Sequence, residues 1–102
     1  MERKNTIEDL YEMINDEKTY KILDSIRGGE KSTKDILSDV NFSMKPFNYL
    51  VKRMFLEGIL AERSTWKTRF YGIDEEGLLR LIERLQNLPE TSVAVEKLSK
   101  YL

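Results

Sequence analysis

The chain has 102 residues, of which 40% are hydrophobic and 34% are charged, and its formal net charge at pH 7 is −1. This length and balance are typical of one soluble domain with a modest core. The chain has neither cysteine nor histidine, which excludes disulfides, thiolate nucleophiles, histidine bases and the usual zinc sites. We therefore expect no enzyme, no metal and no cofactor, although a site made only of carboxylates stays possible in principle.

Nothing in the sequence indicates a membrane or a secretory route. No apolar run approaches the roughly 20 residues that span a bilayer. Charged residues rather than an apolar stretch follow Met1, so there is no sign of a signal peptide. We expect a cytoplasmic protein.

The first part of the chain predicts three helices, because apolar residues recur at intervals of three and four. These stretches are residues 6–14, 17–27 and 32–40. Gly28-Gly29 is expected to end the second helix, and Ser32 with Asp35 forms a variant of the capping box at the start of the third. Asn41 tolerates a left-handed backbone and is expected to form the turn that follows.

A fourth helix is expected from about Ser43 to Glu57, with Ser43 as its N-cap. At about 100° per residue its side chains fall into two sectors. The sector expected in the core contains Phe47, Leu50, Val51, Met54 and Phe55. The opposite sector contains Lys45, Asn48, Tyr49, Lys52 and Arg53, and no acidic residue. Leu56 also points outward, and we expect the start of the next element to cover it.

A β-hairpin is predicted after Gly58. Residues 59–63 and 68–73 are rich in β-branched and aromatic side chains, and a short loop separates them. Three cations, Arg63, Lys67 and Arg69, surround Trp66 at or near the tip. One interpretation is contact with DNA phosphates. The other is that Trp66 packs on the body of the domain while the cations keep the edge strand soluble.

Two more helices complete the chain. One runs from Asp74 to about Leu88, where Pro89 stops it, and the other from Thr91 or Ser92 to Leu102. Their apolar stripes, with that of residues 6–14, exceed what one small domain easily covers. We therefore expect a single domain over 1–102, with its core at about 17–88, that pairs with a second copy through residues 1–15 and 89–102. The alternative is that the tail packs on the first helix within one chain.

Charge is unevenly distributed along the sequence. Residues 1–42 carry 7 basic and 10 acidic side chains, a net charge of −3, and residues 74–102 carry 4 and 6, a net charge of −2. Residues 43–73 carry 6 basic and 2 acidic side chains, a net charge of +4. Binding depends on the field at the contacting surface rather than on the total, so this segregation favours a DNA-binding face in the middle of the chain.

The ordered set of elements resembles the winged helix-turn-helix transcriptional regulators of the ArsR/MarR-like kind, the small archaeal ones in particular. The resemblance covers about residues 18–88. It is carried by residues 22–23, 32–36, 51–60 and 71–77. It implies a mainly α fold with a small β-hairpin (α+β), with extra terminal helices. It also implies a homodimer on a pseudo-palindromic site in double-stranded DNA, with a recognition helix at about 43–57 in the major groove and a wing at about 59–73 on the flanking backbone.

By position, the DNA-binding residues implied are Ser43, Lys45, Asn48, Tyr49, Lys52, Arg53, Arg63, Trp66, Lys67 and Arg69. The absence of cysteine and histidine departs from the metal-sensing branch, so no metal inducer is carried over. A winged helix that docks on another protein is the alternative function.

Two weaker signals are set aside. Residues 28–33 lack the glycine that a phosphate-binding loop places before its lysine. The acidic run Asp74-Glu75-Glu76 suits a helix N-terminus better than a cation site.

Overall fold

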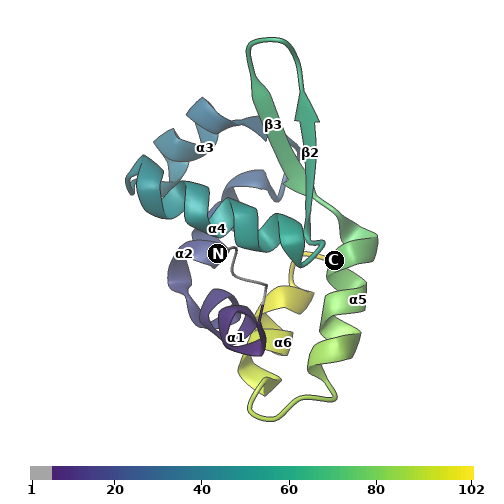
Figure 1. Ribbon diagram of the computed structural model, residues 1–102. Helices are drawn as coiled ribbons and strands as arrows, with labels where there is room; N and C mark the ends of the chain where they lie inside the picture. Colours follow the sequence, from purple (N-terminus) through teal and green to yellow (C-terminus); the bar gives the residue numbers. More distant parts are fainter. Residues whose placement is uncertain (1–5) are drawn as a thin grey trace.

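The computed structural model describes residues 6–102, which form six helices and three strands. In chain order these are α1 (Ile7–Asn15), α2 (Glu17–Ile26), β1 (Lys31–Ser32), α3 (Thr33–Val40), α4 (Met44–Leu56), β2 (Leu60–Ser64), β3 (Arg69–Ile73), α5 (Glu75–Leu85) and α6 (Ser92–Ser99). Figure 1 shows the β2–β3 hairpin projecting at one end, with α5 and α6 toward the other. The predicted mainly α class with a small β component is confirmed.

The caps read from the sequence define most helix starts. The Ser32 side chain accepts a hydrogen bond from the backbone of Asp35 at the start of α3, and the Asp74 side chain accepts one from Gly77 at the start of α5. Asn41 adopts the left-handed backbone predicted for it, with φ 58°. Ser43 occupies the N-cap of α4, but its side chain makes no capping hydrogen bond.

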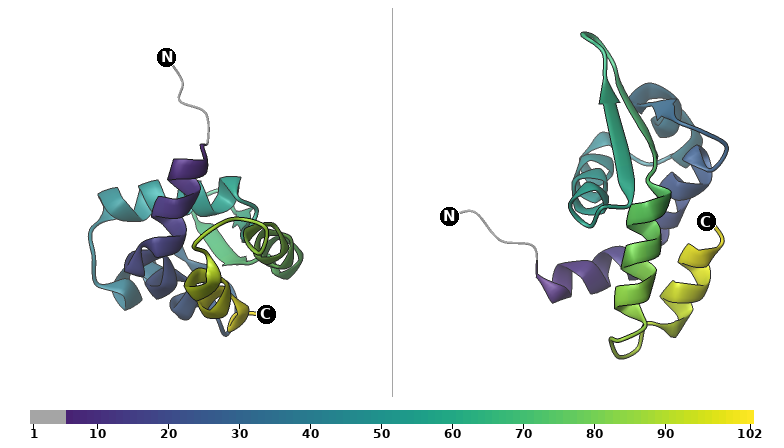
Figure 2. Two further views of the ribbon diagram at one scale, coloured as in Figure 1. Left: turned by 90° about the horizontal axis from the view of Figure 1, so that it is seen from below. Right: turned by 90° about the vertical axis from the view of Figure 1, so that its right-hand side faces the viewer.

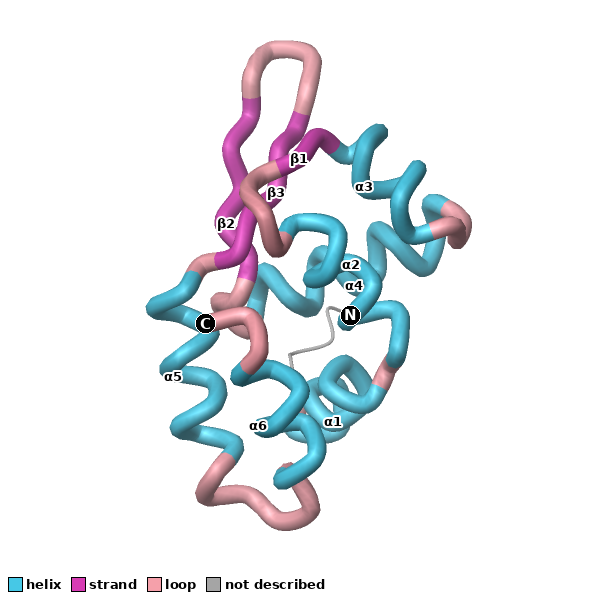
Figure 3. The backbone as a smooth tube through the Cα atoms, turned by 180° about the vertical axis from the view of Figure 1, so that it is seen from behind, coloured by secondary structure: helices cyan, strands magenta, loops and turns pink. Residues whose placement is uncertain are grey.

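The sheet has one strand more than the sequence predicts. Its order is β1-β3-β2, and both pairings are antiparallel. The two-residue β1 pairs Lys31 with Tyr71 and Ser32 with Phe70. Strand β1 therefore ties the start of α3 to the hairpin, and Figure 3 shows the two side by side.

One hydrophobic core runs through all six helices and the sheet. Phe47 of α4 lies at its centre, 1% exposed, and meets the Tyr71 ring edge-on at a centroid distance of 6.3 Å. Phe55, which the helical projection places in the core sector, is 50% exposed, so that prediction is wrong. The expectation that the hairpin covers Leu56 is also wrong, because Leu56 is 51% exposed.

The terminal helices are covered within the chain. Most residues of the apolar stripes of the terminal helices are buried in the common core, with Leu10, Ile14, Leu78, Leu85 and Leu98 each at most 2% exposed, whereas Ile7 in α1 and Leu102 after α6 are 52% and 54% exposed. Tyr11 of α1 also donates a hydrogen bond to the Pro89 carbonyl, at 2.6 Å. The expected apolar surplus is therefore smaller than predicted, because most stripe residues pack in the common core and only a few stay exposed.

Candidate nucleic-acid interface

The outer face of α4 keeps four of its five predicted members in solvent. Lys45, Asn48, Tyr49 and Lys52 are exposed, and so is Ser43 just before the helix. The inner face, built from Phe47, Leu50, Val51 and Met54, anchors the helix in the core. The helical period thus positions these polar side chains together on one side of a fixed element.

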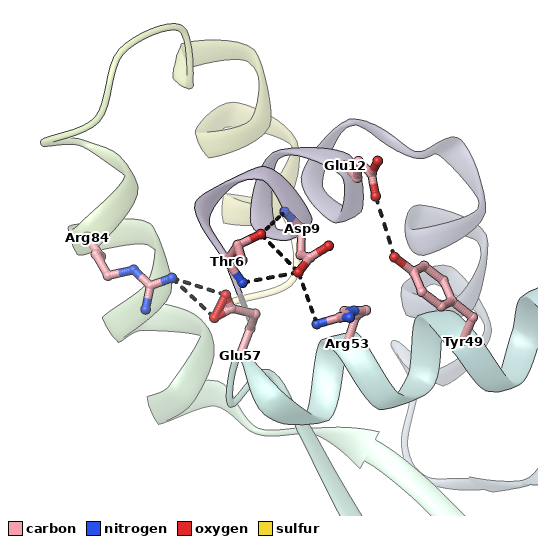
Figure 4. Close-up of polar contacts among 7 residues, drawn as sticks. All are labelled: Thr6, Asp9, Glu12, Tyr49, Arg53, Glu57 and Arg84. Carbon is pink, nitrogen blue, oxygen red and sulfur yellow. Dashed lines mark hydrogen bonds and ion pairs between the residues drawn. The ribbon is translucent and has the colours of Figure 1, made fainter. Parts of the chain in front are cut away.

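Arg53 does not lie on that outer face. Its Nη1 atom is 3.5 Å from Oδ2 of Asp9 in α1, and the two side chains are only 12% and 1% exposed. The same Asp9 oxygen accepts a hydrogen bond from the backbone N–H of Thr6 at 3.1 Å, as part of a capping box. Figure 4 shows this ion pair joining α1 to α4. The outward position predicted for Arg53 is wrong because α1 crosses α4 there, and the period of one helix contains no information about a second.

Other acids also border the face that is acid-free in sequence. The Tyr49 hydroxyl lies 3.4 Å from a Glu12 carboxylate oxygen, and Arg84 of α5 bonds Glu57 at the end of α4 at 3.1 Å (Figure 4). The carboxylates that α1 contributes lie near the middle and C-terminal half of α4. Within α4, Lys45 and Lys52 therefore remain as the exposed cations outside these contacts.

The hairpin presents Trp66 at its tip. Trp66 is 87% exposed, which excludes the interpretation that it packs on the body of the domain. The Nζ atom of Lys67 lies 4.2 Å from the Trp66 ring centroid. At the turn, the Thr65 backbone N–H donates a hydrogen bond of 2.8 Å to the Thr68 carbonyl. The Thr65 hydroxyl donates to the same carbonyl at 3.3 Å and accepts from the Thr68 N–H at 3.2 Å.

The two arginines of the hairpin already have acidic partners. Arg63 bonds Glu30 at 2.6 Å and lies 4.3 Å from the Phe70 ring centroid, while Arg69 is 3.7 Å from Glu62. The hydrogen bond from Arg63 lowers the pKa of Glu30 below its ordinary value, so this acid stays ionised beside the wing. Both arginine side chains remain more than half exposed, and ion pairs this exposed are weak and exchangeable.

Four lysines around this surface make no ion pair with any residue in 6–102. They are Lys34, Lys45, Lys52 and Lys67. Lys34 is absent from the residues that the sequence singles out. It lies in the first turn of α3, and only the pairing of β1 with β3 brings that turn to the hairpin.

Two grooves between the helices and the wing are lined by three of these lysines, Lys34, Lys52 and Lys67. A groove of about 390 Å³ between α4 and the hairpin is lined by Asn48, Lys52, Glu62 and Arg69, among others. A second groove of about 620 Å³, between the starts of α3 and α4 and the hairpin, is lined by Ser32, Thr33, Lys34, Lys67 and Arg69, among others. Arg69 borders both grooves. The structure therefore brings the predicted residues Asn48, Lys52, Lys67 and Arg69 into one surface.

Exposed apolar side chains border the same face. Met44, Tyr49, Phe55 and Leu56 of α4 are each about half exposed, from 47% to 51%. Within residues 6–102 no three acidic side chains converge as a metal site requires, and no helix is long and apolar enough to span a membrane.

No protein-family model matches the sequence, and no curated protein matches it. The structure is similar to the crystal structure of NolR from Sinorhizobium fredii, with a TM-score of 0.60 and 14% sequence identity. The similarity covers 86% of this chain and 97% of the NolR chain. At this identity the likeness concerns the fold alone. Together with the order of helices, short strand and hairpin, it assigns the chain a winged-helix fold with additional helices at both ends.

Proposed function

We propose that the chain is a sequence-specific transcriptional regulator that binds double-stranded DNA. The observation that carries this proposal is the pair of grooves that share Arg69, lined by Lys34, Lys52 and Lys67 with Glu62 as their one acidic side chain. Phosphate contacts from such side chains supply most of the affinity of a DNA-binding protein. Helix α4 would enter the major groove, and the wing would follow the flanking backbone.

The residues of α4 divide into two roles in this proposal. Lys45 and Lys52 bind phosphate or guanine, and Asn48 and Tyr49 read base edges, since an amide can bond adenine with two hydrogen bonds. Lys67, Arg63 and Arg69 hold the backbone beside the wing, and Lys34 adds a contact from α3. Arg53 is assigned to positioning, because its guanidinium faces Asp9.

The homodimer is part of the same proposal. Helix-turn-helix dimers place two recognition helices about 34–36 Å apart, one turn of DNA. The surface we assign to the second copy contains the apolar side chains that the terminal helices leave exposed. These are Ile7, Leu79, Val93 and Leu102.

A charge-reversal pair tests the DNA-binding face. Lys52→Glu should weaken binding to every duplex at least tenfold, because it replaces an attraction to phosphate with a repulsion. Lys100→Glu makes the same change of charge on the tail after α6, and Figure 2 shows α6 on the other side of the molecule from α4. Mobility shifts with random-sequence duplexes compare the two variants. Equal losses of duplex affinity in the two variants, or no loss for Lys52→Glu, would show that DNA binds to another surface.

A protein-binding winged helix is the second candidate function. It is favoured by the half-exposed Met44, Tyr49, Phe55 and Leu56 on α4, since exposed aromatic and methionine side chains are enriched at protein interfaces. Leu56→Ser separates the two functions, since Leu56 is half exposed and lines neither groove. If the face binds DNA through Lys52 and Asn48, the variant should keep duplex affinity within about twofold. If the wild-type protein binds no duplex and the variant loses most of its binding to a protein partner, the second function is favoured.

A further inference from the structure

Among the aromatic side chains of the hairpin, Trp66 is the one that lies almost fully in solvent. It is 87% exposed, whereas Phe70 and Tyr71 of β3 lie against Arg63 and Phe47 respectively. Single exposed apolar residues are common on protein surfaces. Apart from the Lys67 ammonium near its ring, Trp66 presents a large apolar surface to water. Covering that surface with a binding partner would be favourable.

The turn that carries this ring is ordered by hydrogen bonds. Thr65 and Thr68 close the turn with a backbone hydrogen bond of 2.8 Å, and the Thr65 hydroxyl accepts a second from the Thr68 backbone at 3.2 Å. The strands below are paired along their whole length, from Leu60 with Ile73 to Ser64 with Arg69. Figures 1 and 2 show the hairpin extending beyond the rest of the molecule. A ring presented on a pre-ordered turn loses little conformational freedom when it binds.

The surroundings of the ring define the chemistry of its partner. Lys67 lies over the ring, and Arg63 and Arg69 lie at the tip-side end of the strands. No acidic residue lies between Arg63 and Arg69 in the sequence. A flat aromatic surface among cations fits a partner that offers a π-face next to negative charge, and a nucleobase beside its own phosphate has both.

The energies of stacking favour a base that is already outside the helical stack. Opening a step of an intact duplex costs about as much as one base–aromatic contact returns. An unpaired base next to a duplex carries no such cost, so the full gain of stacking appears as affinity. The same ring adds little on an undistorted duplex.

We propose that Trp66 is a stacking site for an unpaired nucleobase, so that the protein prefers duplex DNA with a bulged base beside the wing to the intact duplex. This inference rests on the proposed DNA-binding function and adds a structural preference to it. The cations of the wing hold the phosphates on either side of the bulge, and the Trp66 ring covers the face of the extra base.

The test compares one duplex with the same duplex carrying a single extra nucleotide, by fluorescence polarisation of a labelled strand. Wild-type protein should bind the bulged duplex about fivefold or more tightly, the lower end of the range for one base–aromatic contact. Trp66→Ala should remove this preference and leave intact-duplex affinity within about twofold, while Trp66→Phe should keep most of it. Leu56→Ala, at an exposed apolar residue that lines neither groove, should keep it entirely.

A second readout comes from the protein itself, because Trp66 is its one tryptophan. Its fluorescence should be quenched by the bulged duplex and much less by the intact one. Equal wild-type affinity for the two duplexes, or a preference that survives Trp66→Ala, overturns the inference while leaving the proposed function in place. Binding to neither duplex overturns both. A blue shift with anionic phospholipid vesicles and no response to either duplex would assign the tip to a membrane surface and overturn the inference as well.

Discussion

Lys52 and Arg53 are adjacent cations in the same predicted sector of one helix, but the structure separates their roles. Lys52 lines the groove beside the wing, whereas Arg53 turns to Asp9 and is nearly buried. The period of α4 identifies Lys45, Asn48, Tyr49 and Lys52 correctly as exposed. It does not predict that Arg53 is nearly buried or that Phe55 is half exposed, because the burial of these side chains depends on which other elements pack against α4.

We expect Arg53→Glu to destabilise the fold by about 3 kcal/mol, the lower end for breaking a buried ion pair, since it places a second carboxylate against Asp9. Lys52→Glu makes a charge change of the same size one residue earlier at an exposed position. It should stay within about 0.5 kcal/mol. Chemical denaturation measures both, and similar losses of unfolding free energy would show that the Asp9 contact is not what holds Arg53.

The position of the Trp66 side chain is a second property that the sequence alone does not decide. Composition places a tryptophan among cations near a turn, and both packing on the domain and exposure are consistent with that pattern. Only the length and register of the strands decide between them. With Arg69 paired to Ser64, residues 65–68 form the turn, and the ring lies beyond the reach of the core.

At the scale of elements, the sequence predicts the helices well because most starts have a side chain that caps the first turn, as Ser32 and Asp74 do. Strand β1 is not predictable in this way, since two residues contain no alternation. The end of α5 is predicted three residues too late, at Leu88. The helix ends at Leu85, where the Thr91 hydroxyl donates hydrogen bonds to the carbonyls of Leu85 and Leu88.

The junction between α4, the wing and α5 depends on Gly77. A Cβ atom on Gly77 would lie 1.7 Å from the Gly58 carbonyl oxygen, which belongs to the backbone and cannot rotate away. We expect Gly77→Ala to lower the unfolding free energy by about 2 kcal/mol or more, as overpacking does. Gly28→Ala is the matched control, since nothing lies within 4 Å of its added Cβ. Thermal unfolding compares them, and equal melting temperatures would contradict this close contact.

At the scale of the whole molecule, the winged-helix arrangement follows from the order of elements, but the coverage of the terminal helices does not. Surface-to-volume reasoning predicts more apolar surface than one chain covers. In the structure α5 packs on α6, Tyr11 of α1 donates a hydrogen bond to the Pro89 carbonyl after α5, and the Tyr101 hydroxyl after α6 lies close to Asp24 of α2. Burial, together with the hydrogen bond to Asp24, raises the pKa of Tyr101, which keeps its hydroxyl protonated as a donor.

The second copy is therefore assigned to a smaller surface than the sequence indicates. We expect Leu79→Glu to shift the protein toward monomer in sedimentation velocity, because it places a charge in a desolvated contact. Gln86→Glu adds the same charge at the exposed end of α5 and should leave the oligomeric state unchanged. A monomeric wild-type protein at micromolar concentration, or a Leu79→Glu dimer as stable as the wild type, would contradict the assignment.

The salt dependence of duplex binding tests the DNA-binding face most directly. Lys34, Lys45, Lys52 and Lys67 make no ion pair within residues 6–102, and each phosphate that such a side chain neutralises contributes about −0.9 to the slope of log K against log salt concentration. If these four lysines alone bind phosphates, the slope is about −3.6 for each chain bound, and it steepens to about −5.4 if Arg63 and Arg69 also exchange their acidic partners for phosphates. In either case Lys52→Glu makes the slope shallower by about one. A slope near zero, or one that Lys52→Glu leaves unchanged, would show that this face does not bind DNA.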